Sequence, residues 1–236
     1  MCQHPEVPFF LRVLPMDELI SLAQAVQDRR QPISGVVADA LREAIFRGVF
    51  KPGEPLRQDA IAKQFSVSQV TVREALRLLG EEGVVAIVPR RGAIVACLSD
   101  DDVHEIVELR VMLESMLLAK AIPRLTEEDF DRAEQIIVEL DAAKTLDEQL
   151  SLNVDFHSHL YAKANRPRTL AMLERLRLAL EPYLRMLWSR SQYKSDSQAD
   201  HREILSLCRA GNTKGAQRLL ASHISQTGDE IVKLLH

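Results

Sequence analysis

The feature that most constrains the fold is a short helical segment separated by only three residues from a longer one. RQDAIAKQF predicts the first helix, SVS predicts the turn, and Ser68 is placed to cap the second helix, which Gly83 follows. The apolar face of this second helix is formed by Val72, Ala75, Leu76 and Leu79. Two helices joined by so short a turn form a helix-turn-helix.

A β-hairpin is predicted directly after this motif. VVAIV and AIVAC are rich in strand-forming residues, and PRRG separates them as a turn. A further helical pattern runs from Ser34 to Arg47 and ends at Gly48. Together these elements predict a winged helix-turn-helix over residues 33–98, after a Pro-punctuated N-terminal extension at 1–32.

The chain changes character after Leu98, because strand signals disappear and capping boxes recur. The boxes are expected at Ser99/Asp102, Thr126/Asp129 and Ser197/Asp200. The predicted helices are 100–121, 127–143, 146–164, 168–190, 198–210 and 213–234. The expected fold class is mainly α, a winged helix-turn-helix with a small β-hairpin wing, then an all-α antiparallel bundle at 99–236 that binds an effector and dimerises.

Composition excludes several classes of protein. The 236 residues contain no long uncharged apolar run, so no membrane association is expected, and the opening residues do not form a secretion signal. Cys2, Cys97 and Cys208 are too few and too widely spaced for a disulfide framework or a Cys-x-x-Cys site. The net charge of −4 combines a small basic surplus in residues 33–98 with an acidic surplus beyond them. These features indicate a soluble cytoplasmic protein.

Three stretches carry a family resemblance: ALREAIFRGVFKPGEPL, VSQVTVREALRLLGEEGVV and PRRGAIV. Together they resemble the winged helix of the GntR family, and the helical remainder is similar to its FadR-like branch, with an FCD-type ligand-binding domain. The resemblance covers about residues 33–230. It departs from the family pattern at Ser66 (usually Gly), at Gln69-Val70-Thr71 (usually Arg-Thr-Pro or a relative) and at Asp59 (often Arg), and these departures concern the operator sequence more than the fold.

The second helix of such a motif lies in the major groove, with its N-terminal residues facing base edges. An Arg there can bond both acceptors of guanine and a Gln can pair with adenine, while the cations and Gly of the wing tip can approach a narrow groove. The residues expected to contact DNA are Arg57, Ser68, Gln69, Thr71, Arg73, Arg90, Arg91 and Gly92. The alternatives are an exposed Arg73 paired with Glu74 and a solvated loop at the wing tip.

Three histidines, His157, His201 and His223, lie on the apolar stripes of three different predicted helices. A single inward histidine is usually an ordinary core residue, but three would each need a polar partner, and one divalent ion can satisfy all of them. Asp155 and His159 lie two positions from His157 and point to other faces of the helix, so neither is expected to be a ligand.

The family resemblance extends this set, because many FadR-like members have an Asp or Asn one turn before an FH pair, then a DH pair and an HI pair. By that resemblance Asn153, His157, His201 and His223 are the metal ligands, and zinc is the expected metal, with nickel and manganese as alternatives. Asp is the commoner residue at position 153, and a neutral Asn is a weaker ligand.

Arg110 and Glu114 occupy ELRVMLE, and in similar family members this Arg faces the effector cavity. Arg110 is therefore a candidate clamp for a small carboxylate effector, against the alternative of an i,i+4 ion pair on a solvated face. The resulting hypothesis is a DNA-binding regulator, a repressor in the first instance, that binds its operator as a homodimer. A metal-dependent hydrolase and a metal-free sensor of lipid-type ligands are the two competing functions.

Overall fold

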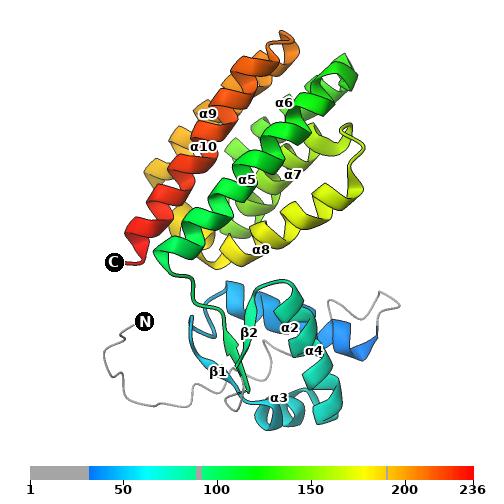
Figure 1. Cartoon of the computed structure of the whole chain (residues 1–236), viewed down its shortest axis with the longest axis vertical. Coiled ribbons are helices and arrows are strands. Elements are labelled where there is room, and N and C mark those ends of the chain that lie inside the picture. Colours follow the sequence, from blue (N-terminus) through cyan, green and yellow to red (C-terminus); the bar gives the residue numbers. More distant parts are fainter. Residues whose placement is uncertain (1–31, 89–91, 190) are drawn as a thin grey trace. The chain divides into compact units, whose positions relative to one another are not determined.

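The computed structural model describes residues 32–88, 92–189 and 191–236, so the N-terminal extension and the wing-tip residues Arg90 and Arg91 lie outside the described part. The chain divides into two compact units, Met1–Ser99 and Asp100–His236 (Figure 1).

In its described residues, 32–88 and 92–99, the first unit contains three helices and a small sheet. Its helices are α2 (Ile33–Phe46), α3 (Gln58–Phe65) and α4 (Gln69–Glu81), and its strands are β1 (Pro55–Leu56), β2 (Val85–Val88) and β3 (Gly92–Val95). The strands form an antiparallel sheet in the order β1-β3-β2. The core lies between α2 and α4, where Leu41, Val72, Leu76 and Leu79 are almost fully buried. This arrangement confirms the predicted winged helix-turn-helix and adds β1, whose two residues are too few to give an alternating pattern.

The turn of the helix-turn-helix contains a residue in the left-handed conformation. Ser66 ends α3 with φ of 53°, a backbone geometry that glycine adopts most easily. Two residues later the side chain of Ser68 accepts a hydrogen bond from the backbone N–H of Thr71, and so caps α4 as predicted.

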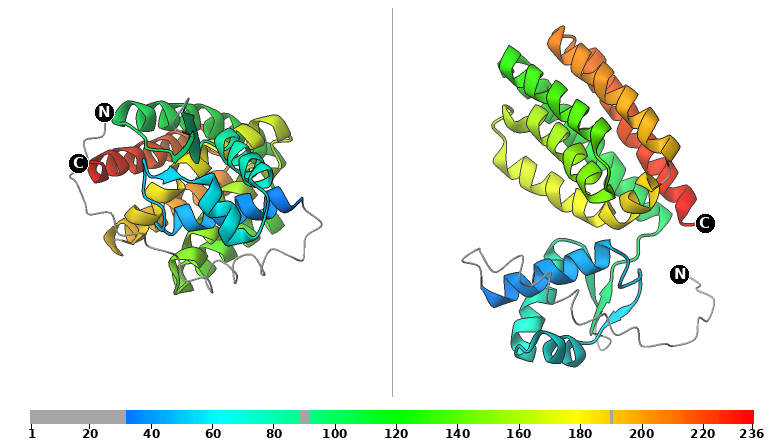
Figure 2. Two further views of the ribbon diagram at one scale, coloured as in Figure 1. Left: turned by 90° about the horizontal axis from the view of Figure 1, so that it is seen from below. Right: turned by 180° about the vertical axis from the view of Figure 1, so that it is seen from behind.

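The second unit consists of helices. They are α5 (Asp100–Ala121), the 3-10 turn η1 (Ile122–Arg124), α6 (Glu127–Ala142), α7 (Leu146–Ala162), α8 (Pro167–Trp188), α9 (Ser191–Arg209) and α10 (Thr213–Leu234). Figures 1 and 2 show α10 packed along α5 and beside α9. The approach of α10 to α5 requires Gly228, because a Cβ at that position would lie 2.6 Å from Cγ2 of Val107.

The expected mainly helical fold is confirmed, but one helix start was predicted wrongly. Because α9 begins at Ser191, the pair Ser197/Asp200 lies inside it and does not form a capping box. Thr126/Asp129 does form a box, and a second one at Thr145/Glu148 begins α7. Within the described ranges, no helix is both long enough and apolar enough to cross a bilayer.

Candidate metal centre and nucleic-acid interface

The three predicted histidines meet inside the second unit. His157 comes from α7, His201 from α9 and His223 from α10, and one ring nitrogen of each lies within 4.8 Å of the other two. Their exposed fractions are 3%, 0% and 7%, because each residue lies on the stripe of its helix that packs into the bundle. Three converging imidazoles on three helices are a ligand set typical of zinc and related metals.

Hydrogen bonds to the Nδ1 atoms determine which nitrogen of each ring faces the cluster. Nδ1 of His201 lies 2.8 Å from the amide oxygen of Gln198, and Nδ1 of His223 lies 3.0 Å from a carboxylate oxygen of Asp200. Because these oxygens only accept, both Nδ1 atoms carry the hydrogen. In the neutral form of either ring, the Nε2 lone pair is therefore left for another partner.

His157 is held in the same way by a weaker contact. The Tyr161 hydroxyl donates to Glu114 Oε2 at 2.8 Å, so its oxygen is left to accept from Nδ1 of His157, 3.4 Å away. In all three histidines, Nδ1 is bonded to a protein oxygen and Nε2 faces the cluster. Metal-binding histidines are usually held in this way.

Burial keeps two of these rings uncharged. It holds the pKa of His157 well below its usual value, and the proximity of His223 and of the positive charges of Arg177 and Arg110 adds to the effect. The pKa of His201 is lowered for the same first reason, followed by its proximity to His157 and His223. Neutral imidazole is the form that binds a metal ion.

Three buried side-chain atoms lack a hydrogen-bond partner among the described residues. One is Nε of Arg185, which still has an ion pair with Glu181. The other two belong to the predicted ligand set: Nε2 of His201 and Oδ1 of Asn153, the residue one turn before His157 on α7. Leaving such an atom unsatisfied costs about 1–3 kcal/mol. A divalent ion coordinated by Asn153, His157, His201 and His223 would satisfy both atoms, so these residues fit the metal that the family resemblance implies. Asp155 is exposed, and His159 Nε2 contacts the backbone oxygen of Asp129 instead, as expected for non-ligands.

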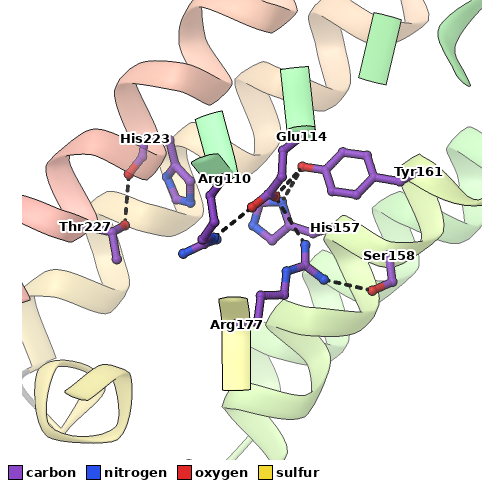
Figure 3. A network of polar contacts seen from close by, with 8 residues as sticks. All are labelled: Arg110, Glu114, His157, Ser158, Tyr161, Arg177, His223 and Thr227. Atoms are coloured by element: carbon purple, nitrogen blue, oxygen red, sulfur yellow. Dashed lines mark hydrogen bonds and ion pairs between the residues drawn. The ribbon is translucent and has the colours of Figure 1, made fainter. Parts of the chain in front are cut away.

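Beside the histidines, one buried carboxylate joins two guanidinium groups (Figure 3). Glu114 is fully buried, and its two oxygens lie 2.8 Å from Nε of Arg110 and 3.2 Å from Nη2 of Arg177. Burial alone would raise the pKa of Glu114, but the charges of Arg110 and Arg177 outweigh it and leave that pKa below its usual value. The i,i+4 pair of Arg110 and Glu114 therefore exists, but on a buried face instead of a solvated one.

The two arginines differ in what remains free. Arg177 uses Nη2 for Glu114 and Nη1 for the hydroxyl of Ser158, 3.1 Å away. Arg110 uses Nε, and within the described part of the chain neither of its Nη atoms has a hydrogen-bond partner. The pair of terminal nitrogens on Arg110 is the edge that can bind a carboxylate bidentately. Arg177, which sequence reasoning missed, holds Glu114 in place.

The start of α4 carries four of the predicted DNA-reading residues, Ser68, Gln69, Thr71 and Arg73. Gln69, Val70 and Arg73 are exposed and Thr71 is partly so, while the hydroxyl of Ser68 is engaged with Thr71 in the helix cap. Arg57 is exposed at the start of α3, and Gly92 begins β3 with φ of 82°. The predicted contacts of Arg90 and Arg91 lie outside the described residues.

Arg73 and its neighbour Arg77 differ in whether an acidic side chain already pairs with them. Arg77 forms ion pairs with Glu74 and Glu81. Arg73 has neither a hydrogen bond nor an ion pair within the described ranges, and Glu74, its expected alternative partner, is taken by Arg77. An unpaired cation on the exposed first turns of a recognition helix is suited to contact DNA.

Comparison with known proteins agrees with this architecture. Residues 33–95 match the model of bacterial regulatory proteins of the gntR family, and residues 105–226 match the FCD domain. The chain is 29% identical over 204 residues to the uncharacterized HTH-type transcriptional regulator YdhC of Bacillus subtilis, covering 83% of this chain and 89% of the relative. It is 29% identical over 196 residues to the HTH-type transcriptional repressor GlaR of Escherichia coli, covering 78% and 89%. Among solved structures, Escherichia coli McbR/YncC shares the fold, with a TM-score of 0.72, 23% identity, and 87% of this chain and 100% of that one covered.

The chain is therefore a transcriptional regulator that binds DNA through a winged helix-turn-helix. It belongs to the GntR family, with a C-terminal FCD domain. The relatives are regulators and not enzymes, which confirms that part of the sequence interpretation and sets the hydrolase hypothesis aside.

Proposed function

We propose that this regulator is a repressor whose affinity for its operator is controlled by a small carboxylate metabolite, bound at or near a divalent metal ion in the FCD domain. It acts in the cytoplasm on a near-palindromic site as a homodimer, since one winged helix makes too few contacts for useful specificity. The proposed metal ligands are Asn153, His157, His201 and His223, with zinc as the first candidate and nickel or manganese as alternatives. The observation that carries the proposal is the pair of unpartnered buried atoms, Oδ1 of Asn153 and Nε2 of His201, within this ligand set.

Charge supports an anionic effector. The four proposed ligands are neutral, so a bound ion keeps its full positive charge and offers open coordination positions. Arg110 and Arg177 contribute two further charges, of which Glu114 compensates one. The free Nη edge of Arg110 would hold one end of a carboxylate ligand.

The position of Arg110 supports a link to DNA binding. Arg110 lies on α5, and α5 begins at Asp100, directly after the first unit ends at Ser99. His223 lies on α10, which packs tightly against α5 at Gly228. A ligand that pulls Arg110 and the histidines together would therefore act on the helix that continues from the wing. By linkage, the effector must weaken DNA binding by the same factor as DNA weakens effector binding.

Replacing Arg73 tests the DNA interface. Arg73→Ala should weaken specific binding by about 1–3 kcal/mol, the range for a good bidentate base contact. The measurement is fluorescence anisotropy at fixed salt, on a duplex recovered by in vitro selection. Arg77→Ala is the matched control, because that side chain is already paired on the same helix, and its effect should be smaller. Unchanged affinity of a folded Arg73→Ala protein would show that the recognition helix is assigned wrongly.

Replacing Asn153 tests the proposal that the uncancelled charge of the metal ion attracts an anionic effector. Asn153→Asp should bind zinc more tightly, because a carboxylate is a stronger ligand, and should bind the carboxylate effector more weakly, because it cancels part of the ion's charge. Thermal-shift screening of small carboxylates supplies the effector, and titration calorimetry measures both affinities. Asp155→Asn, a charge change on the exposed side of the same helix, should leave both nearly unchanged. Equal or tighter effector binding by the Asn153→Asp protein would refute this account.

A further inference from the structure

We infer that Gln198 is a positioning residue that holds His201 in the tautomer with hydrogen on Nδ1, and so turns the Nε2 lone pair toward the proposed metal centre. The inference rests on the proposed function, since it assigns a role within that centre. Gln198 lies on α9 one turn before His201 and is 3% exposed.

The orientation of the Gln198 amide follows from its partners. Its Nε2 lies 2.8 Å from Oδ1 of Asp141 and 3.3 Å from the backbone oxygen of Ile137, both on α6. A backbone carbonyl and a carboxylate accept hydrogen bonds, so the amide group that faces them is the NH₂. The opposite end of the amide, the oxygen, therefore faces Nδ1 of His201 at 2.8 Å.

This arrangement discriminates between the two neutral forms of His201. With hydrogen on Nδ1, the ring donates to Gln198 and leaves an unshared pair on Nε2. With hydrogen on Nε2, two acceptor atoms would face each other across 2.8 Å, and a buried N–H would have no partner among the described residues. The oxygen of Gln198 therefore selects the form with hydrogen on Nδ1.

Only an amide at position 198 can both accept a hydrogen bond from His201 and donate to the oxygens of Ile137 and Asp141. A glutamate at 198 would still accept from His201, but its second oxygen would face the acceptors of Ile137 and Asp141. Asp141 is itself held by an ion pair with Arg202, whose Nη1 donates to the backbone oxygen of Gln198. The orientation of His201 is therefore fixed from α6 through one neutral, fully bonded amide.

Nitrogen-15 NMR of the metal-free full-length protein, with labelled histidine, reports this tautomer without any metal. In the wild-type protein we expect the hydrogen of His201 on Nδ1. In Gln198→Met, which keeps the length of the side chain but removes its polar atoms, we expect a mixture that includes the Nε2–H form. Gln217→Met is the matched control, because it removes a comparable amide hydrogen bond, to the backbone oxygen of Ser115, without contacting a histidine. Its His201 signals should match those of the wild type.

Competition with a chromophoric chelator then measures zinc affinity of the same proteins. Loss of a partner behind a metal-binding histidine typically costs about 10–100-fold in affinity, which we expect for Gln198→Met and not for Gln217→Met. Hydrogen on Nε2 of His201 in the wild-type metal-free protein would overturn the inference, and that result needs no variant to fold. A folded Gln198→Met protein in which the His201 tautomer and the zinc affinity are both unchanged would also overturn the inference. A wild-type protein with hydrogen on Nδ1 that binds no zinc would instead overturn the proposed metal centre.

Discussion

Glu114→Leu should destabilise the FCD domain by about 3–5 kcal/mol, the usual cost of removing one partner from a buried ion pair. The cost is high because the carboxylate is fully buried and serves both Arg110 and Arg177, which would be left as uncompensated charges. Tyr161 would also lose the acceptor for its hydroxyl. Urea denaturation, followed by a signal from the helical domain, measures the loss in free energy of unfolding.

Glu139→Leu is the control for this change. Glu139 pairs with Arg132 at the surface, where both side chains are more than a third exposed, and such pairs contribute at most about 1 kcal/mol. If Glu114→Leu cost no more than Glu139→Leu, the two guanidinium groups would have to reach water, and the description of a buried charge cluster would be wrong.

His201→Ala and His223→Ala should abolish stabilisation by metal. A ligand that binds the native state at about 1,000 times its dissociation constant stabilises it by about 4 kcal/mol. With zinc at that excess, we expect this gain in the wild-type protein and none in either variant, measured by denaturation with and without the ion. His159→Ala should keep the gain, because His159 contacts the backbone of Asp129 and not the cluster. A wild-type protein that gains nothing from zinc, nickel or manganese would favour a metal-free sensor.

Most helices could be predicted from the sequence, because their apolar residues recur at helical spacing and polar interruptions separate them. The prediction was wrong at the start of α9, because the polar run SQYKSDSQ has no apolar periodicity although the helix already begins at Ser191. The strand β1 was missed because two residues carry no pattern, and its pairing with β3 is a tertiary contact.

For the candidate site, the sequence indicated residues on inward faces but not their partners. His157, His201 and His223 were found because each interrupts an apolar stripe. The same signal exists for Arg177, which is buried on α8 between Leu173 and Leu180, and it could have been used. The contact of Gln198 with Asp141 could not have been predicted from the sequence. The two residues lie 57 positions apart, and only the packing of α9 on α6 brings them together.

Anomalous diffraction from crystals of the zinc-loaded protein, recorded at the zinc edge, would locate the ion. We expect one peak per chain in the FCD domain, about 2.0–2.1 Å from Nε2 of His157, His201 and His223, the normal zinc–imidazole distance. The amide oxygen of Asn153 should complete the protein ligands. A peak bound elsewhere, or zinc-soaked crystals in which the three imidazoles hold no ion, would show that this cluster is not a metal centre.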